Sequence, residues 1–102
     1  MGTAARVFRA LADPTRRQIL EELKRGELGA GEIGGRFEIS APSISRHLAI
    51  LKAAELVSER RDGNRILYRL EPETLIVSLD SYLSAVCPTQ MRQRRGIAAR
   101  RG

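Results

Sequence analysis

The chain contains few of the residue types that build metal, redox or base-stacking sites. Its 102 residues include one cysteine, one histidine, two tyrosines, two phenylalanines and no tryptophan. A single cysteine cannot form an intrachain disulfide, which predicts a reducing cytoplasmic setting. Scarce aromatic residues argue against a stacking platform for single-stranded nucleic acid. No apolar run is long enough to span a bilayer, so we expect no membrane partner.

Positive charge is distributed unevenly along the chain. Residues 88–102 contain five arginines and no acidic residue, whereas residues 1–87 hold thirteen cations and twelve acids and are therefore near +1. This composition predicts one domain over residues 1–87 and a basic, disordered tail over residues 88–102. Within the domain, one stretch concentrates the cations Arg46, Lys52, Arg60, Arg61, Arg65 and Arg69. Such a stretch is either an electrostatic footprint for phosphates or a solvated charged surface.

The most informative segment covers residues 40–57. Ser40 is suited to cap a helix, and Pro42 lies in the first turn, where its missing N–H costs no hydrogen bond. Ile44 and Leu48 recur at helical spacing and continue along one stripe, which predicts a core-facing side. The opposite side begins with small, polar residues. A recognition helix needs this combination if its first turn is to approach base edges in a major groove.

The flanking segments predict four helices, a hairpin and a last helix. The expected helices cover residues 4–11, 14–25, 30–37, 41–54 and 72–87, and the expected strands cover residues 56–60 and 65–70. Asp62, Gly63 and Asn64 between the strands form a strong hairpin-turn signal. The order ααααββα predicts a mainly α fold with a small β-hairpin wing, which is a winged helix-turn-helix.

Three motifs in this order resemble the ArsR family of bacterial repressors. They are ALADPTRRQIL at residues 10–20, ISAPSISRHLAILKAAELV at residues 39–57 and RRDGNRILYRL at residues 60–70. The compact chain, with residues 13–20 and 42–48, is most similar to the SdpR-type autorepressors. The resemblance implies a sequence-specific repressor of the bacterial cytoplasm, associated with the nucleoid through double-stranded operator DNA. No nucleophile–base pair, paired carboxylates or phosphate-cradling glycine loop is present, so we expect no enzyme activity.

The DNA-contact hypothesis assigns roles to the start of the recognition helix and to the hairpin. The predicted DNA-contacting residues are Ser40, Ala41, Pro42, Ser43, Ser45, Arg46, His47, Arg61, Asn64 and Arg65. Arg46 is suited to a bidentate contact with guanine or to a phosphate. His47 either donates to DNA or forms a hydrogen bond inside the domain, and the hairpin residues either contact DNA or form a solvated wing tip. Arg16 and Arg17 are interpreted as structural or surface residues that pair with acids such as Glu21.

The first and last helices contain more apolar residues than one small core requires. The residues predicted for a dimer interface are Val7, Phe8, Leu11, Leu75, Leu79, Tyr82, Leu83 and Val86. A monomer rarely keeps such a patch exposed, so we expect a homodimer built through the terminal helices on a palindromic operator. The alternative is that the last helix packs only on its own domain.

The segments that carry sensor ligands in the family lack them here. Metal-sensing members use a cysteine pair before the recognition helix, or Asp and His ligands along the last helix. Residues 28–35 contain neither Cys nor His, and the last helix offers Asp80 without a histidine. We therefore expect no metal and no cofactor, and either constitutive autorepression or release by a regulatory protein partner. An effector- or redox-responsive repressor and a winged-helix protein-interaction module are the remaining alternatives.

Overall fold

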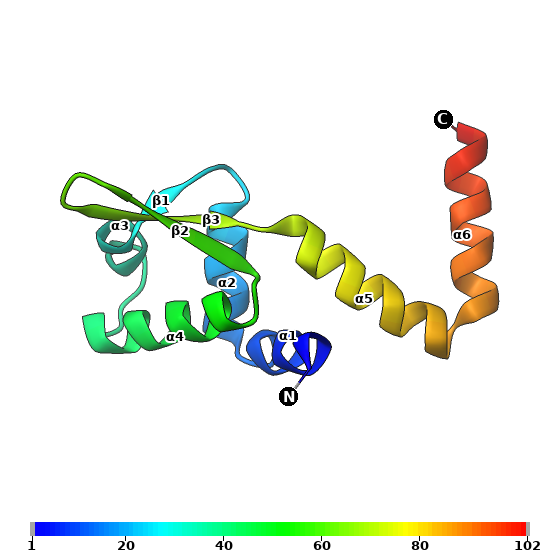
Figure 1. The fold of residues 1–102 in the computed structure, drawn as a ribbon, viewed down its shortest axis with the longest axis horizontal. Coiled ribbons are helices and arrows are strands. Elements are labelled where there is room, and N and C mark those ends of the chain that lie inside the picture. Colours follow the sequence, from blue (N-terminus) through cyan, green and yellow to red (C-terminus); the bar gives the residue numbers. More distant parts are fainter. Residues whose placement is uncertain (1, 102) are drawn as a thin grey trace.

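The computed structural model describes residues 2–101, with side chains for residues 2–94. Six helices and three strands follow one another along this part of the chain (Figure 1). They are α1 (Thr3–Leu11), α2 (Pro14–Leu23), β1 (Leu28–Gly29), α3 (Ala30–Gly35), α4 (Ala41–Ala53), β2 (Val57–Asp62), β3 (Arg65–Leu70), α5 (Pro72–Val86) and α6 (Pro88–Arg101). The predicted fold class is confirmed. The added strand β1 has two residues, too few for an alternating pattern in the sequence to reveal it.

Both proline-containing helix starts are confirmed. Asp13 caps α2, because its Oδ1 accepts a hydrogen bond from the Arg16 backbone N–H at 3.1 Å, and Pro14 follows in the first turn. The same hydrogen bond lowers the pKa of Asp13 below its usual value. Ser40 caps α4, since its Oγ accepts from the Ser43 backbone N–H at 3.3 Å. Local cap chemistry thus fixes where α2 and α4 begin.

One hydrophobic core joins α1, α2, α3 and α4 to the sheet. Its largest fully buried side chains are Val7, Ile19, Leu23, Ile33, Leu48, Leu51 and Leu56. Helix α4 places Ile44, Leu48 and Leu51 into this core and packs against α1, α2, α3 and β2. Full burial of one such side chain contributes about 1.5–3 kcal/mol relative to exposure. The core therefore holds α4 by one side and leaves its other side outward.

The three strands form an antiparallel sheet in the order β1-β3-β2. Asp62 pairs with Arg65, which leaves Gly63 and Asn64 as a two-residue turn. Gly63 has a φ of +64°, the left-handed backbone that suits glycine at the first central position of a type II′ hairpin turn. This hairpin is the predicted wing. Its strand β3 is held to the body by pairing with β1 and by packing against α2 and α3.

Helix α4 ends in a Schellman motif around Glu55. The Glu55 N–H donates to the Lys52 carbonyl at 2.9 Å, and the Leu56 N–H donates to the Leu51 carbonyl at 3.0 Å. Glu55 has a φ of 61°, a left-handed conformation that is usually taken by glycine at this position. The motif turns the chain from α4 into β2 and buries Leu56 in the core.

The C-terminal segment differs from the prediction of a disordered tail. Helix α6 follows α5 after Cys87 and contacts α5 (Figure 1). Pro88 begins α6, and the Met91 N–H donates to the Cys87 carbonyl at 3.1 Å. The Arg, Gln and Ala residues that follow have high helix propensity, which outweighs the charge and glycine content used for the prediction. Residue 102, also assigned to the tail, lies outside the described residues. Within the described part of the chain, no helix has the length and apolar character needed to cross a membrane.

Candidate nucleic-acid interface

The start of α4 and the turn of the hairpin lie at the same end of the molecule. Figure 1 shows both at the left end of the longest axis, with α3 between them, whereas α5 and α6 occupy the opposite end. The described chain extends 47 Å along this axis. Helix α3 packs against α4 and β3, so it fixes the position of the recognition helix relative to the wing. This arrangement presents one helix start and one hairpin turn to a common ligand.

The first turn of α4 is exposed but not free of internal contacts. Ser40, Ala41 and Pro42 are exposed, and Ser43 is half-buried. The Ser40 hydroxyl donates to the Ser43 hydroxyl at 3.0 Å while it caps the helix. Ser40 and the Ser43 N–H are therefore occupied by the cap, and Pro42 has no N–H, so this turn offers a ligand the Ala41 N–H and small side chains.

Ser45 and Arg46 form the outward side of α4 after this first turn. Both side chains are exposed, while their neighbour Ile44 is buried in the core. Arg46 has no hydrogen-bond or ion-pair partner among the side chains that the structure describes. Its guanidinium is therefore free to bind an external acceptor with its forked donors.

His47 combines the two alternatives left open by the sequence. It is half-buried, and its Nδ1 lies 3.2 Å from Nη1 of Arg16. A guanidinium only donates, so Nδ1 of neutral His47 accepts this hydrogen bond and the proton resides on Nε2. His47 thus forms an internal hydrogen bond and still keeps Nε2–H as a donor.

Arg16 links the end of α1 to the recognition helix. Besides the contact with His47, its Nε donates to the Ala10 carbonyl at 2.8 Å and its Nη2 donates to the Arg9 carbonyl at 3.1 Å. Arg17 donates to the Leu11 carbonyl at 2.7 Å. Both arginines are structural as predicted, but the predicted acidic partners are wrong, because backbone carbonyls at the end of α1 take their place.

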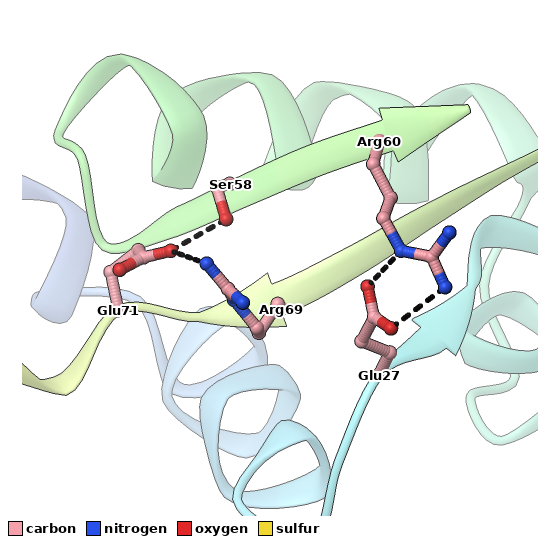
Figure 2. A network of polar contacts seen from close by, with 5 residues as sticks. All are labelled: Glu27, Ser58, Arg60, Arg69 and Glu71. Carbon is pink, nitrogen blue, oxygen red and sulfur yellow. Dashed lines mark hydrogen bonds and ion pairs between the residues drawn. The ribbon is translucent and has the colours of Figure 1, made fainter. Parts of the chain in front are cut away.

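Four of the six cations in the predicted basic stretch lie beside carboxylates. The ion pairs are Lys52 with Glu59, Arg60 with Glu27, Arg65 with Glu32 and Arg69 with Glu71. Arg60 binds both carboxylate oxygens of Glu27, at 2.7 and 3.0 Å, as Figure 2 shows. The hydrogen bond from Arg60 lowers the pKa of Glu27. These pairs remove much of the positive field that the sequence alone suggests.

Glu71 connects the two strands of the wing at their inner end. Its Oε1 accepts hydrogen bonds from the Ser58 hydroxyl at 2.6 Å and from Nη2 of Arg69 at 3.2 Å (Figure 2). These contacts lower the pKa of Glu71, with Ser58 as the larger cause. Ser58 and Arg69 are cross-strand neighbours, so this contact reinforces the register of β2 and β3.

Arg65 ties the wing to α3. It forms an ion pair with Glu32, whose Oε1 also accepts a hydrogen bond from the Gly29 N–H at 3.1 Å. A Cβ atom at Gly29 would lie 3.1 Å from Nη2 of Arg65, so only glycine leaves the guanidinium its full space. Arg61 and Asn64 are exposed at the hairpin, and Arg61 has no hydrogen-bond or ion-pair partner among the described side chains. Of the predicted wing contacts, Arg65 is thus the one that is already engaged.

Helices α1 and α5 expose an apolar face on the other part of the molecule. Its exposed members are Phe8, Ile76, Val77, Tyr82, Leu83 and Val86. The rings of Phe8 and Tyr82 meet edge to face, with centroids 5.2 Å apart, so exposed apolar side chains of α1 and α5 are in contact at this point. Below, these six residues are called the terminal-helix face.

The predicted set of interface residues needs one correction. Val7 is fully buried in the core of its own chain and has no surface to offer a partner. Leu11 and Leu75 are half-buried and pack against that core, and Leu79 is half-buried as well. Ile76 and Val77, which are not in the predicted set, are 64% and 58% exposed. Helical periodicity identified the apolar stripe but could not separate its inward side from its outward side.

The described residues contain no group of three or more His, Cys, Asp or Glu side chains placed to hold a metal ion. The lone cysteine, Cys87, is free and half-buried at the end of α5.

Comparison with known proteins connects this geometry to one family. A family model described as "Bacterial regulatory protein, arsR family" matches residues 13–59, which include α2, β1, α3, α4 and the first half of β2. Over 80 residues the chain is 49% identical to the transcriptional repressor SdpR of Bacillus subtilis, covering 78% of this chain and 89% of SdpR. The chain belongs to the ArsR family of bacterial regulatory proteins. It is a non-enzymatic transcriptional repressor of the ArsR and SdpR type, as predicted, and DNA binding is implied by that membership.

Other ArsR-family relatives agree in fold and differ in length. The crystal structure of an ArsR-like transcriptional regulator from Rhodococcus sp. RHA1 superimposes with a TM-score of 0.76 at 33% identity, covering 93% of this chain and 89% of that one. The HTH-type transcriptional regulator KmtR of Mycobacterium tuberculosis is 51% identical over 67 residues, or 66% of this chain. The matched part spans about half of KmtR, 52% of its length, so the similarity to KmtR concerns that part alone.

Proposed function

We propose that this ArsR-family repressor acts as a homodimer on a palindromic operator in its own promoter. The observation that carries the proposal is the common placement of the start of α4 and the hairpin turn at one end of the molecule (Figure 1). At that end, Arg46 and Arg61 are the members of the basic stretch without an ion-pair partner among the described side chains. The similarity to SdpR supports repression, and the resemblance to SdpR-type autorepressors motivates the choice of its own promoter.

Residues of α4 divide into base-contacting and phosphate-contacting candidates. Arg46 reaches a guanine edge or a phosphate from the exposed side of the helix, with Ser45 beside it as a hydroxyl donor or acceptor. His47 donates through Nε2–H, since Nδ1 already accepts from Arg16. The start of α4 faces a phosphate with the Ala41 N–H and the positive end of the helix dipole, because Pro42 has no N–H and the Ser43 N–H donates to Ser40.

The wing supplies the flanking contacts. Arg61 and Asn64 are exposed on the hairpin and contact the sugar-phosphate backbone next to the groove that α4 occupies. Arg65 contributes mainly by holding the wing to α3 through Glu32, because its guanidinium is already paired. Neutralisation of Arg61 is therefore expected to reduce the salt dependence of binding, while Arg65 acts through the position of the wing.

The terminal-helix face provides the dimer contact. An apolar surface that joins Phe8 of α1 to Tyr82, Leu83 and Val86 of α5 is costly to expose in water. Two copies that bury this face around a two-fold axis place their α4 helices on opposite sides of the axis. Successive major grooves on one side of DNA are about 34–36 Å apart, so the operator is expected to contain two inverted half-sites at that spacing or a multiple of it.

The proposal is tested by measuring binding to the promoter fragment of its own gene after Arg46→Ala. Loss of a bidentate base contact should weaken specific binding by about 1–3 kcal/mol. Arg25→Ala is the matched control, because Arg25 is exposed in the loop after α2 and lacks a partner among the described side chains. Equal affinities for Arg46→Ala and the wild type would remove Arg46 from the site. Absence of any binding by the wild type at low salt would favour a protein-interaction module instead.

A further inference from the structure

Helix α6 carries a strong positive charge that the proposed operator contacts do not involve. Helix α6 contains five arginines and no acid, while residues 1–87 have a net charge near +1. Within α6, Arg92 and Arg94 are exposed and have no hydrogen-bond or ion-pair partner among the described side chains. The excess positive charge of the sequence thus lies outside the winged helix-turn-helix.

The wing shows the opposite situation. There, Arg60, Arg65 and Arg69 are each paired with a carboxylate. A cation that already has a carboxylate partner must give up that partner before it binds a phosphate, so it adds little to counterion release. The winged unit is therefore built for a small number of defined contacts, and it lacks the excess charge that usually supplies sequence-independent affinity.

We propose that α6 is a second DNA-binding element, which contacts phosphates without sequence preference and supplies most of the salt-dependent affinity. This inference rests on the proposed function, because it assumes that the winged unit binds an operator. Its occupant is duplex DNA, since a helix with five arginines and no acid complements the phosphate backbone in charge.

The position of α6 specifies which phosphates it reaches. Figure 1 places α6 beyond α5, at the end of the long axis opposite the hairpin turn. The described chain extends 47 Å along this axis, which is more than one helical turn of DNA, about 34 Å. In the proposed dimer, α5 lies near the two-fold axis, so α6 contacts DNA between the half-sites or on a neighbouring segment rather than the wing's own phosphates.

The test measures binding of the full chain to a random-sequence duplex and to its own promoter fragment over a range of salt. In the first variant, Gln replaces all five arginines Arg92, Arg94, Arg95, Arg100 and Arg101, and in the second variant Lys replaces them. Gln and Lys are both good helix formers, so circular dichroism should show unchanged helix content. We expect the Gln variant to lose at least about tenfold in affinity for the random duplex at low salt, with a salt slope that falls by about 0.9 per lost phosphate contact.

The Lys variant should keep both the affinity and the slope, because it keeps the charge. An unchanged slope in the Gln variant would overturn the proposal, as would an equal loss in the Lys and Gln variants. Binding to phosphatidylserine vesicles that depends on the α6 arginines and exceeds binding to DNA would overturn the proposal in favour of a membrane surface. Failure of this inference can be distinguished from failure of the proposed function. If only this inference fails, the wild type still binds its promoter fragment through Arg46. If the proposed function fails, the wild type binds neither the promoter fragment nor the random-sequence duplex.

Discussion

The two ends of the molecule differ in how many of their apolar side chains are buried and how many of their cations are paired with carboxylates. At the end with the wing, apolar residues such as Ile33 are buried and Arg60 and Arg65 lie beside carboxylates. At the opposite end, α5 exposes Ile76 and Val86, and α6 has arginines without acids. At the first end most cations of the wing are paired and Arg46 and Arg61 are left for a ligand, whereas at the second end large apolar side chains are exposed and α6 has no acid of its own.

This difference separates folding from assembly. Asp13, Ser40 and the core around Leu51 fix the recognition helix within one chain and do not require a partner. The terminal-helix face and α6 are proposed to be completed by a second copy and by DNA. Substitutions at the two ends should therefore change different quantities, namely the free energy of unfolding at one end and the association constants at the other.

The largest expected effect is on the core of the winged unit. Leu51 is fully buried, so Leu51→Ala should lower the free energy of unfolding by about 2–5 kcal/mol. Val86→Ala is the control in α5, because Val86 is 59% exposed and should change unfolding of one chain by less than about 0.5 kcal/mol. Urea unfolding at several protein concentrations separates this term from association. Equal losses in the two variants would break the distinction between the ends.

The next effect concerns association. Ile76→Asp places a charge at the most exposed residue of the terminal-helix face and should weaken the dimer by at least about 100-fold, or about 3 kcal/mol. Ser81→Asp introduces the same charge at an exposed polar position of the same helix and should leave the dimer intact. Sedimentation equilibrium measures both constants. A dimer unaffected by Ile76→Asp would place the contact elsewhere.

The smallest expected effect concerns stability and the backbone conformation of Glu55, which follows the end of α4. Glu55 has a left-handed backbone with a φ of 61°, so Glu55→Gly should stabilise the fold by about 1 kcal/mol. Glu55→Ala keeps the unfavourable Cβ and should bring no such gain, which makes it the matched control. Thermal unfolding checks both variants, and dimerisation should not change in either. A loss of stability in Glu55→Gly would show that the side chain, rather than the backbone, determines this position.

Features set by neighbouring residues could be predicted from the sequence. Asp13 with Pro14 and Ser40 with Pro42 each combine a cap and a proline within a few residues, so the starts of α2 and α4 were determined locally. The turn at Gly63 was predictable for the same reason. These elements were enough to define the winged helix-turn-helix.

Features that join distant residues could not be predicted in this way. Arg65 meets Glu32 and Arg16 meets His47 across 33 and 31 residues, so tertiary packing decides which cations remain free. Val7 and Phe8 are adjacent apolar residues of α1, yet one is buried in the core and the other is exposed. Helical periodicity cannot assign such neighbours to a core or to an interface, because both lie near the edge of one stripe.

The central claim is that two copies, joined through the terminal-helix face, place their α4 helices in successive major grooves of one operator. Hydroxyl-radical footprinting of the wild-type protein on its own promoter tests this most directly. The account predicts two protected segments in inverted orientation, with centres about 10–10.5 base pairs apart or a whole multiple of that distance. A single protected segment without an inverted counterpart would contradict it.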